Sequence, residues 1–501
     1  MTESLVPNGA SAQEALEVGM AHGRRAAAGT LQFLSVQVLA LPVGLFIAAF
    51  VTRVLGPELY GLFVTASSIV VWIELSASLG FRSTTVKFVA ESTDWRGVAS
   101  TLLQVQLVIG VVAAGLLVVI SPILASWLGS PQLTGYLRLF AVEIPLFTVG
   151  HLLSSVLIGR GRFGQAALIL AVGWAGRLVL VLVLLGLGFS ITGAILAVIG
   201  SSVGQVIVAL IFARPALSRR FAISLREAAG YVMPLLGYGM AMRLYTRVDL
   251  LAVKAWAGTA QAAGFYGAAQ NLTTTPLAML ATSFSPLLLA TVSQLSREGQ
   301  VRVSQATTRQ AMRLVLCLLP FGGLMAGAAS EIVLVIYGHQ YLASAPLVAL
   351  LVFGGLALTM IRISASVLIA EGRPGWPVAL SGPLVAALLG ACLLLVPRFG
   401  AVGAAASAAA LASLGAGISV WGVYRRTGVA PSLVTMARVA VTTLIACALA
   451  SAWPTPGVWV VLKLAAVSAI IVACLFLLKE LTAQDVAFVR SLLRMERKRP
   501  V

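Results

Sequence analysis

Charged side chains lie inside long apolar segments at several points of this chain, where a charge is costly. Four arginines and one histidine stand out among them: Arg177, Arg243, Arg247, Arg362 and His151. A guanidinium group is always charged, and it binds phosphate oxygens through two parallel hydrogen bonds. We therefore predict a water-filled cavity that these five residues line. It would bind a solute or amphiphile that carries phosphate or another fixed negative charge.

Helical geometry places some of these residues together. Successive helical residues are 100° apart, so Arg243 and Arg247 share one face, whereas Asp249 points elsewhere. The alternative interpretation is that such residues are paired, or extend their charged ends to the membrane surface. We favour that interpretation for Arg138 and Lys254, which lie near the ends of their apolar segments.

Other kinds of chemistry have no support in the sequence. The three histidines show no metal-ligand spacing, and there is no Cys-x-x-Cys. We interpret the four cysteines as small buried hydrophobic residues and predict no metal site. The stretch 159–164 fits G-x-G-x-x-G, but it follows an apolar helix instead of a strand, so we predict a tight turn there.

The elements that position these residues are membrane-spanning helices. The 501 residues are 59% hydrophobic and only 10% charged, which excludes a water-soluble protein. A spanning helix needs about 20 apolar residues. We predict about fourteen such helices, an all-α polytopic membrane protein, over residues 28–52, 60–80, 98–121, 136–158, 165–187, 190–213, 229–253, 263–291, 311–337, 343–370, 375–396, 400–424, 434–452 and 457–478.

The distribution of cations predicts the orientation of the chain. Lys and Arg gather at both ends and in alternate loops, for example at Arg82, Lys87 and Arg96, and again at Arg160 and Arg162. The net charge of +18 is then a positive-inside bias, not a sign of nucleic-acid binding. We expect both termini to be cytoplasmic.

An internal repeat divides the predicted helices. Residues 155–164 and 366–375 match at seven of ten positions with an offset of 211, and residues 55–61 and 257–264 form a weaker echo. We predict two pseudo-symmetric six-helix bundles, 28–213 and 229–424, with His151 and Arg362 facing each other across the axis. The remaining parts are a cytoplasmic N-terminal segment (1–27), a cytoplasmic linker (214–228), two further transmembrane helices (425–478) and a basic amphipathic tail (479–501).

Several stretches resemble one transporter family. They are Arg53–Phe63, Leu79–Phe81 and Val86–Ala90 in the first half, and Arg247–Leu251 and Ala263–Ala269 in the second. Together they resemble the bacterial polysaccharide transporters. These are the O-antigen and exopolysaccharide flippases of the multidrug/oligosaccharidyl-lipid/polysaccharide (MOP) exporter superfamily, and the resemblance covers the first twelve helices in order. It implies a MATE-like fold and a transporter, not an enzyme.

The resemblance also implies a substrate and a site of ion coupling. Relatives flip undecaprenyl-pyrophosphate-linked oligosaccharide across the bacterial inner membrane by alternating access, for lipopolysaccharide or exopolysaccharide synthesis. The pyrophosphate would then meet the arginines while the lipid tail stays in the bilayer. Related members couple transport to H+ or Na+ through a buried carboxylate, for which Asp249, Glu143 and Glu74 are the candidates. Implied partners are membrane lipids and the polymerase and glycosyltransferases of the pathway, with no cofactor besides the coupling ion.

Two other functions remain as alternatives. A cation-coupled multidrug exporter would share the fold, but organic cations need an acidic or aromatic pocket, not one rich in arginine. A membrane glycosyltransferase or polymerase of the same pathway would need a carboxylate or histidine cluster in a sizeable loop. No loop of this chain is long enough.

Overall fold

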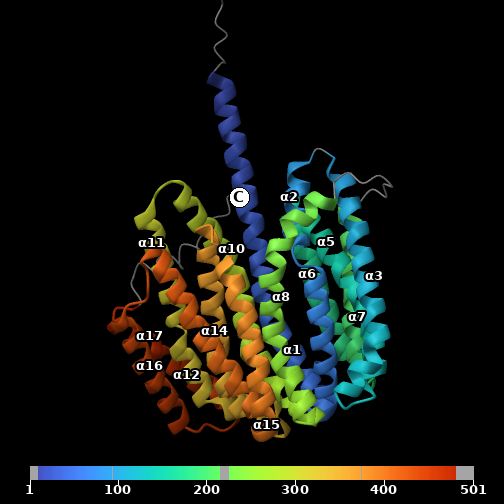
Figure 1. Ribbon diagram of the computed structural model, residues 1–501, viewed down its shortest axis with the longest axis vertical. Helices are drawn as coiled ribbons and strands as arrows, with labels where there is room; N and C mark the ends of the chain where they lie inside the picture. Colours follow the sequence, from blue (N-terminus) through green and yellow to red (C-terminus); the bar gives the residue numbers. More distant parts are fainter. Residues whose placement is uncertain (1–8, 93, 215–224, 374, 481–501) are drawn as a thin grey trace, which may run out of the picture. The chain divides into compact units, whose positions relative to one another are not determined.

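The computed structural model describes residues 9–92, 94–214, 225–373 and 375–480, and these residues form helices that short turns connect (Figure 1). The helices of the first half are α1 (Gly9–Ala77), α2 (Phe81–Glu91), α3 (Trp95–Trp127), α4 (Leu133–Phe140), α5 (Glu143–Gly159), α6 (Phe163–Gly186) and α7 (Ile191–Ala213). Those of the second half are α8 (Leu225–Trp256), α9 (Ala260–Leu272), α10 (Thr274–Arg297), α11 (Val301–Leu316), α12 (Leu319–Gly327), α13 (Ala329–Tyr337), η1 (His339–Ser344), α14 (Ala345–Ala370), α15 (Gly375–Thr427), α16 (Leu433–Ala452), η2 (Gly457–Trp459) and α17 (Val460–Leu477). The described residues contain no strand, and the all-α prediction is confirmed.

Ten helical stretches of the described residues are long and apolar enough to cross a membrane. Their outer faces keep large apolar side chains exposed, as at Val108, Val112 and Val119 of α3, which are 61%, 63% and 72% exposed. So much exposed apolar surface is unfavourable in water and suits bilayer hydrocarbon. The chain is a multi-pass membrane protein, while the number of fourteen spans stays a prediction.

Glycines break the two longest helices. Inside α1, Gly56 has φ 69° and ψ 172°, and inside α15, Gly400 has φ 59° and ψ −142°. Only glycine adopts such positive φ values without strain. Each long helix therefore consists of two arms, and each break falls where the sequence predicts one span to end and the next to begin.

The helices group into two compact units. Unit 1 contains residues 1–47 and 66–243, and unit 2 contains residues 48–65 and 244–501. In unit 1, α5 packs against α2, α3 and α7, and α6 packs against α7 (Figure 1). Unit 2 is built around α14, which packs against α10, α12 and α15. Residues 48–65 and the first part of α8 are thus grouped differently from the predicted bundles.

The structure describes the predicted terminal and linking segments only in part. Residues 9–27, predicted as a cytoplasmic N-terminal segment, belong to α1 and are helical. The predicted amphipathic tail, apart from residues 479 and 480, lies outside the described residues, as do residues 215–224 of the predicted linker. The two further transmembrane helices correspond to α16 and α17.

The repeat seen in the sequence has a counterpart in the backbone. At the end of α5 the N–H of Gly161 donates to the carbonyl of Ile158 (2.9 Å), and at the end of α14 the N–H of Gly372 donates to that of Ile369 (3.1 Å). In both turns the next N–H reaches back five residues, over 2.8 and 2.9 Å. Both glycines have positive φ, 71° and 75°. Each helix therefore ends in the same glycine C-cap, 211 residues apart.

Small residues attach α16 to the rest of unit 2. A Cβ atom added at Gly327 of α12 would lie 2.4 Å from the carbonyl oxygen of Cys447, and one added at Gly323 would lie 2.5 Å from that of Thr443. Such spacing of glycines lets two membrane helices approach closely. The predicted pair of extra helices is therefore an integral part of unit 2.

Candidate functional site

Three arginines gather around His151 in unit 1. The His151 ring lies against that of Phe147, one turn earlier in α5, with centroids 4.1 Å apart. Arg82 of α2, Arg177 of α6 and Arg243 of α8 are all close enough to act electrostatically on the imidazole. Three predicted site residues therefore share one neighbourhood. Arg82, which the sequence predicts to lie in a cytoplasmic loop, joins them.

Close contact between α6 and α7 positions Arg177. Its guanidinium carbon lies 5.8 Å from the centre of the Trp174 ring, and its Nε lies 3.4 Å from the Ser201 hydroxyl. A Cβ atom on Gly173 would fall 1.5 Å from Nε2 of Gln205, so a larger residue there would require the Gln205 side chain to move. Arg177 is thus held on two sides, while its side chain stays half-buried.

Glu143 is a buried acidic group within electrostatic reach of Arg177. It lies in the first turn of α5, is 1% exposed, and accepts a hydrogen bond on Oε1 from the Ser202 hydroxyl. Its other oxygen, Oε2, is buried and accepts no hydrogen bond within the described part of the chain. Arg177 acts on it electrostatically. Oε2 can therefore receive a proton or a cation without the loss of an existing hydrogen bond.

Asp249 in α8 accepts hydrogen bonds from three residues of unit 2. The Tyr266 hydroxyl donates to Oδ2 (2.7 Å), and Nε2 of Gln270 donates to both carboxylate oxygens (3.1 and 3.0 Å). The backbone N–H of Leu250 donates to Oδ1 (2.8 Å). Asp249 is 4% exposed. A buried carboxylate is tolerated only when donors surround it in this way.

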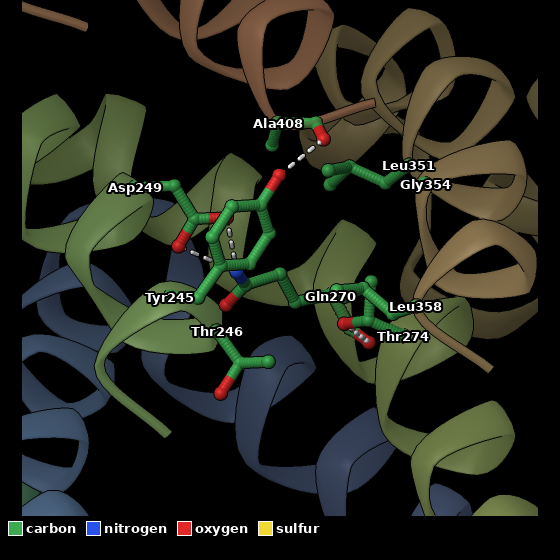
Figure 2. Close-up of a pocket in the computed structure, with 9 residues that line it drawn as sticks. All are labelled: Tyr245, Thr246, Asp249, Gln270, Thr274, Leu351, Gly354, Leu358 and Ala408. Atoms are coloured by element: carbon green, nitrogen blue, oxygen red, sulfur yellow. Dashed lines mark hydrogen bonds between the residues drawn. The ribbon is translucent and has the colours of Figure 1, made fainter. Parts of the chain in front are cut away.

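A small cavity of about 20 Å³ opens beside this carboxylate (Figure 2). That volume holds about one water molecule. The lining residues are Tyr245, Thr246, Asp249, Gln270, Thr274, Leu351, Gly354, Leu358 and Ala408. Hydroxyl, amide and carboxylate oxygens are the ligands that hard cations prefer. The cavity therefore has room for one ordered water or one small ion beside the carboxylate, within a lining that is mostly apolar.

The remaining predicted site residues are distributed over both units. Arg247 and Arg362 are half-buried and belong to unit 2, where Arg247 acts electrostatically on Asp249. Glu74, 3% exposed, lies near the end of α1 in unit 1. His151 and Arg362 fall in different units, and their predicted facing across the axis stays a prediction.

Two ion pairs of the described residues join positions far apart in the sequence, Arg438 with Glu480 (3.1 Å) and Lys463 with Glu331. Lys463 of α17 is buried and donates to Oε2 of Glu331 in α13, whose Oε1 accepts from the backbone N–H of Thr455 (2.8 Å). Each charge of this pair was visible inside a predicted span. The pair fastens α17 to α13, because separating the two would leave each charge alone in an apolar environment.

The segment 48–65 packs tightly within unit 2 through two glycines that correspond in the weaker echo of the repeat. A Cβ atom on Gly61 would lie 1.7 Å from the carbonyl oxygen of Ala260, and one on Gly264 would lie 2.1 Å from that of Pro57. The contact is reciprocal, because each carbonyl precedes the opposite glycine by four residues. The segment is also held by Arg53, whose Nε donates to the carbonyl of Ile336 (2.9 Å) at the end of α13.

Cysteine and histidine form no metal centre in the part of the chain that the structure describes. The four cysteines are free. No group of three or more His, Cys, Asp or Glu side chains comes together among the described residues.

Comparison with solved structures identifies the fold. The structure matches the lipid II flippase MurJ in its inward closed conformation with a TM-score of 0.71 and 12% identity, over 92% of this chain and 99% of that one. It matches an inward-facing multidrug resistance MATE family transporter of the MOP superfamily with a TM-score of 0.60 and 16% identity, over 80% of this chain and 98% of that one. The predicted MATE-like fold is confirmed, whereas the arrangement as two six-helix bundles stays a prediction.

Comparison of sequences identifies the family. The succinoglycan biosynthesis transport protein ExoT of Rhizobium meliloti is 24% identical over 332 residues, which cover 64% of this chain and 62% of that protein. A family model described as "Polysaccharide biosynthesis protein" matches residues 50–346, more than half of the chain. The chain therefore belongs to the polysaccharide biosynthesis protein family, as its motifs predict.

Proposed function

We propose that this protein flips a lipid-linked oligosaccharide across the bacterial inner membrane by alternating access, for the synthesis of a cell-surface polysaccharide. The family, the likeness to a succinoglycan transport protein and the fold shared with a lipid II flippase support the proposal. The observation that carries it is the group of Arg82, Arg177 and Arg243 around His151. Guanidinium groups gathered within an apolar unit are suited to recognise an anion.

The chemistry of the site favours a pyrophosphate. Two linked phosphates offer oxygens to more than one guanidinium at a time, and each Arg–phosphate pair can form two parallel hydrogen bonds. Undecaprenyl pyrophosphate carries such a group between its lipid tail and its sugars. In this proposal the arginines bind the pyrophosphate and the tail remains in the bilayer. No covalent bond forms or breaks, so transport requires no catalytic residue.

Asp249 is our candidate for ion coupling, with Glu143 as the second choice. Asp249 adjoins a cavity of one-ion size with hydroxyl and amide groups around it, whereas Glu143 offers one free oxygen and a single hydroxyl partner. We propose that H+ or Na+ bound beside Asp249 drives the change between the two access states.

The tightly packed segment 48–65 is our candidate for the moving part. Two interactions keep it within unit 2: the reciprocal glycine contact with α9, and the hydrogen bond from Arg53 to the carbonyl of Ile336 at the end of α13. Alternating access requires contacts that form in one state and break in the other. We propose that both ends of the chain are cytoplasmic. The segment, which lies around the turn between the first two predicted spans, is then on the periplasmic side, and its release would open that side. The polymerase and glycosyltransferases of the pathway are proposed partners.

The multidrug alternative finds less support at the site. The MATE transporters share the fold only, and the described charges around His151 are predominantly cationic. An organic cation would be repelled there. Drug resistance conferred by overexpression of this protein would favour that alternative.

Transport in proteoliposomes tests the proposal. A fluorescent lipid-pyrophosphate oligosaccharide is reconstituted with the full chain, and its arrival in the opposite leaflet is followed by quenching. The double variant Arg177→Ala, Arg243→Ala should lower the rate by about tenfold or more, because each lost charged hydrogen bond is worth about 1.5–3 kcal/mol. Arg138→Ala is the matched control, because Arg138 is exposed on α4 of the same unit. Undiminished flipping by the double variant would remove the assigned role.

A further inference from the structure

A second cationic cluster lies at one end of unit 1, where α3 begins and α5 turns into α6. The guanidinium carbon of Arg160 lies 3.8 Å from the centre of the Trp95 ring, and that of Arg96 lies 5.3 Å from it. Trp95 itself packs against the apolar core formed by α2, α3 and α5. One fixed ring therefore supports two guanidinium groups that come from different helices.

The cluster carries three like charges. Arg162 and Arg96 both act electrostatically on Arg160, and burial together with these neighbours lowers the pKa of Arg160 from its ordinary value. Among the residues that the structure describes, no carboxylate oxygen lies within 4.0 Å of any of the three guanidinium groups. Like charges held this close repel one another unless an anion lies between them.

The cluster lies at the ends of three helices that are long and apolar enough to cross a membrane. Three apolar spans begin or end at the cluster: Trp95–Trp127 begins there, Leu133–Gly159 ends there, and Phe163–Gly186 begins there. Because the ends of spanning helices face the membrane surfaces, we expect the guanidinium groups near lipid head groups. Tryptophan is enriched at the boundary between hydrocarbon and head groups.

The repeat provides an internal comparison. The turn after α14 has the same hydrogen bonds and the same positive-φ glycine as the turn after α5. In that turn Glu371 occupies the position of Arg160, and Arg373 occupies that of Arg162. The fold of the turn consequently does not require Arg160. A general bias toward positive loops does not explain why one turn carries two arginines at these positions while the other carries one glutamate and one arginine.

We propose that Arg96, Arg160 and Arg162 bind the phosphate group of an anionic phospholipid in the surrounding membrane. The guanidinium forks match phosphate oxygens, and Trp95 holds two of the three groups at head-group depth. Basic residues at an anionic surface each add to such binding. This site does not depend on the proposed transport activity.

Lipid-selective quenching tests the inference. The full chain is placed in nanodiscs that contain brominated phosphatidylglycerol or brominated phosphatidylcholine. The fluorescence due to Trp95 is isolated by subtraction of a Trp95→Phe variant. Quenching should show a preference for phosphatidylglycerol of about tenfold or more, since three arginines face the head group.

Matched variants distinguish lipid binding at this cluster from a general attraction of anionic lipids to positive charge. Arg160→Gln combined with Arg162→Gln should abolish the preference, whereas Arg373→Gln, at the corresponding exposed position after α14, should keep it. Arg96→Gln serves as a second probe if the double variant does not fold. Equal quenching by the two lipids, or an equal loss in Arg373→Gln, would overturn the proposal. Displacement of phosphatidylglycerol by micromolar inorganic pyrophosphate would also overturn it, because the site would then bind a soluble anion.

Discussion

The reciprocal glycine contact in unit 2 makes Gly61→Ala a sharp perturbation. A Cβ atom there would lie 1.7 Å from the carbonyl oxygen of Ala260, while real Cβ contacts stay beyond 3.0 Å. The segment 48–65 would therefore have to move by about 1.3 Å (3.0 − 1.7), or leave α9. The obstacle is a backbone atom, so no rotamer change can relieve the clash.

The size of the effect follows from the cost of overpacking, about 1–3 kcal/mol. At about 1.4 kcal/mol per tenfold, this penalty shifts the balance between the docked and released segment about 5- to 140-fold toward release. Gly264→Ala should act in the same direction, because its Cβ would meet the carbonyl oxygen of Pro57 at 2.1 Å.

Thiol labelling measures this shift. In a background without the four native cysteines, Thr52→Cys places a thiol where the native side chain is 0% exposed. Addition of Gly61→Ala should raise its labelling rate and slow flipping, because one access state is disfavoured. Gly115→Ala in α3 is the control, since a Cβ there meets nothing within 4 Å. If Gly61→Ala and Gly115→Ala show the same labelling rate and the same flipping rate, the reasoning about the contact of segment 48–65 is refuted.

Three further perturbations test other parts of the structure. Lys463→Met should lower the free energy of unfolding by about 3–5 kcal/mol, because Glu331 loses its buried counter-charge. Further substitution with Glu331→Leu should recover much of the loss. Denaturation in micelles measures both changes. Asp249→Asn should abolish the dependence of transport on an imposed Na+ or H+ gradient, and a variant that still responds to either gradient would contradict its role. Ser202→Ala should lower stability by about 1–3 kcal/mol, because Glu143 loses its described hydrogen-bond donor; an unchanged unfolding midpoint would show that this bond contributes little.

Local patterns in the sequence predict much of the fold. The apolar segments predict the helical class, and the 211-residue offset predicts the shared turn at Gly161 and Gly372. These features depend on neighbouring residues alone, so the sequence contains them directly. The grouping of residues 48–65 with unit 2 depends instead on packing against distant helices, which no local pattern encodes.

The candidate site is predicted less completely, for the same reason. The sequence identifies Arg177, Arg243 and His151 because they interrupt apolar segments. It assigns Arg82 to a loop, since only the tertiary arrangement brings α2 beside α5. The hydrogen bond between Glu143 and Ser202 likewise joins residues 59 positions apart, beyond any spacing argument.

Substrate discrimination tests the central claim most directly. Flipping of a lipid-pyrophosphate oligosaccharide is compared with that of the same oligosaccharide on an uncharged lipid glycoside, in the wild type and in Arg177→Ala, Arg243→Ala. The account predicts that the wild type prefers the pyrophosphate by about tenfold or more, and that the double variant loses this preference. Equal rates for the two lipids in the wild type would contradict it.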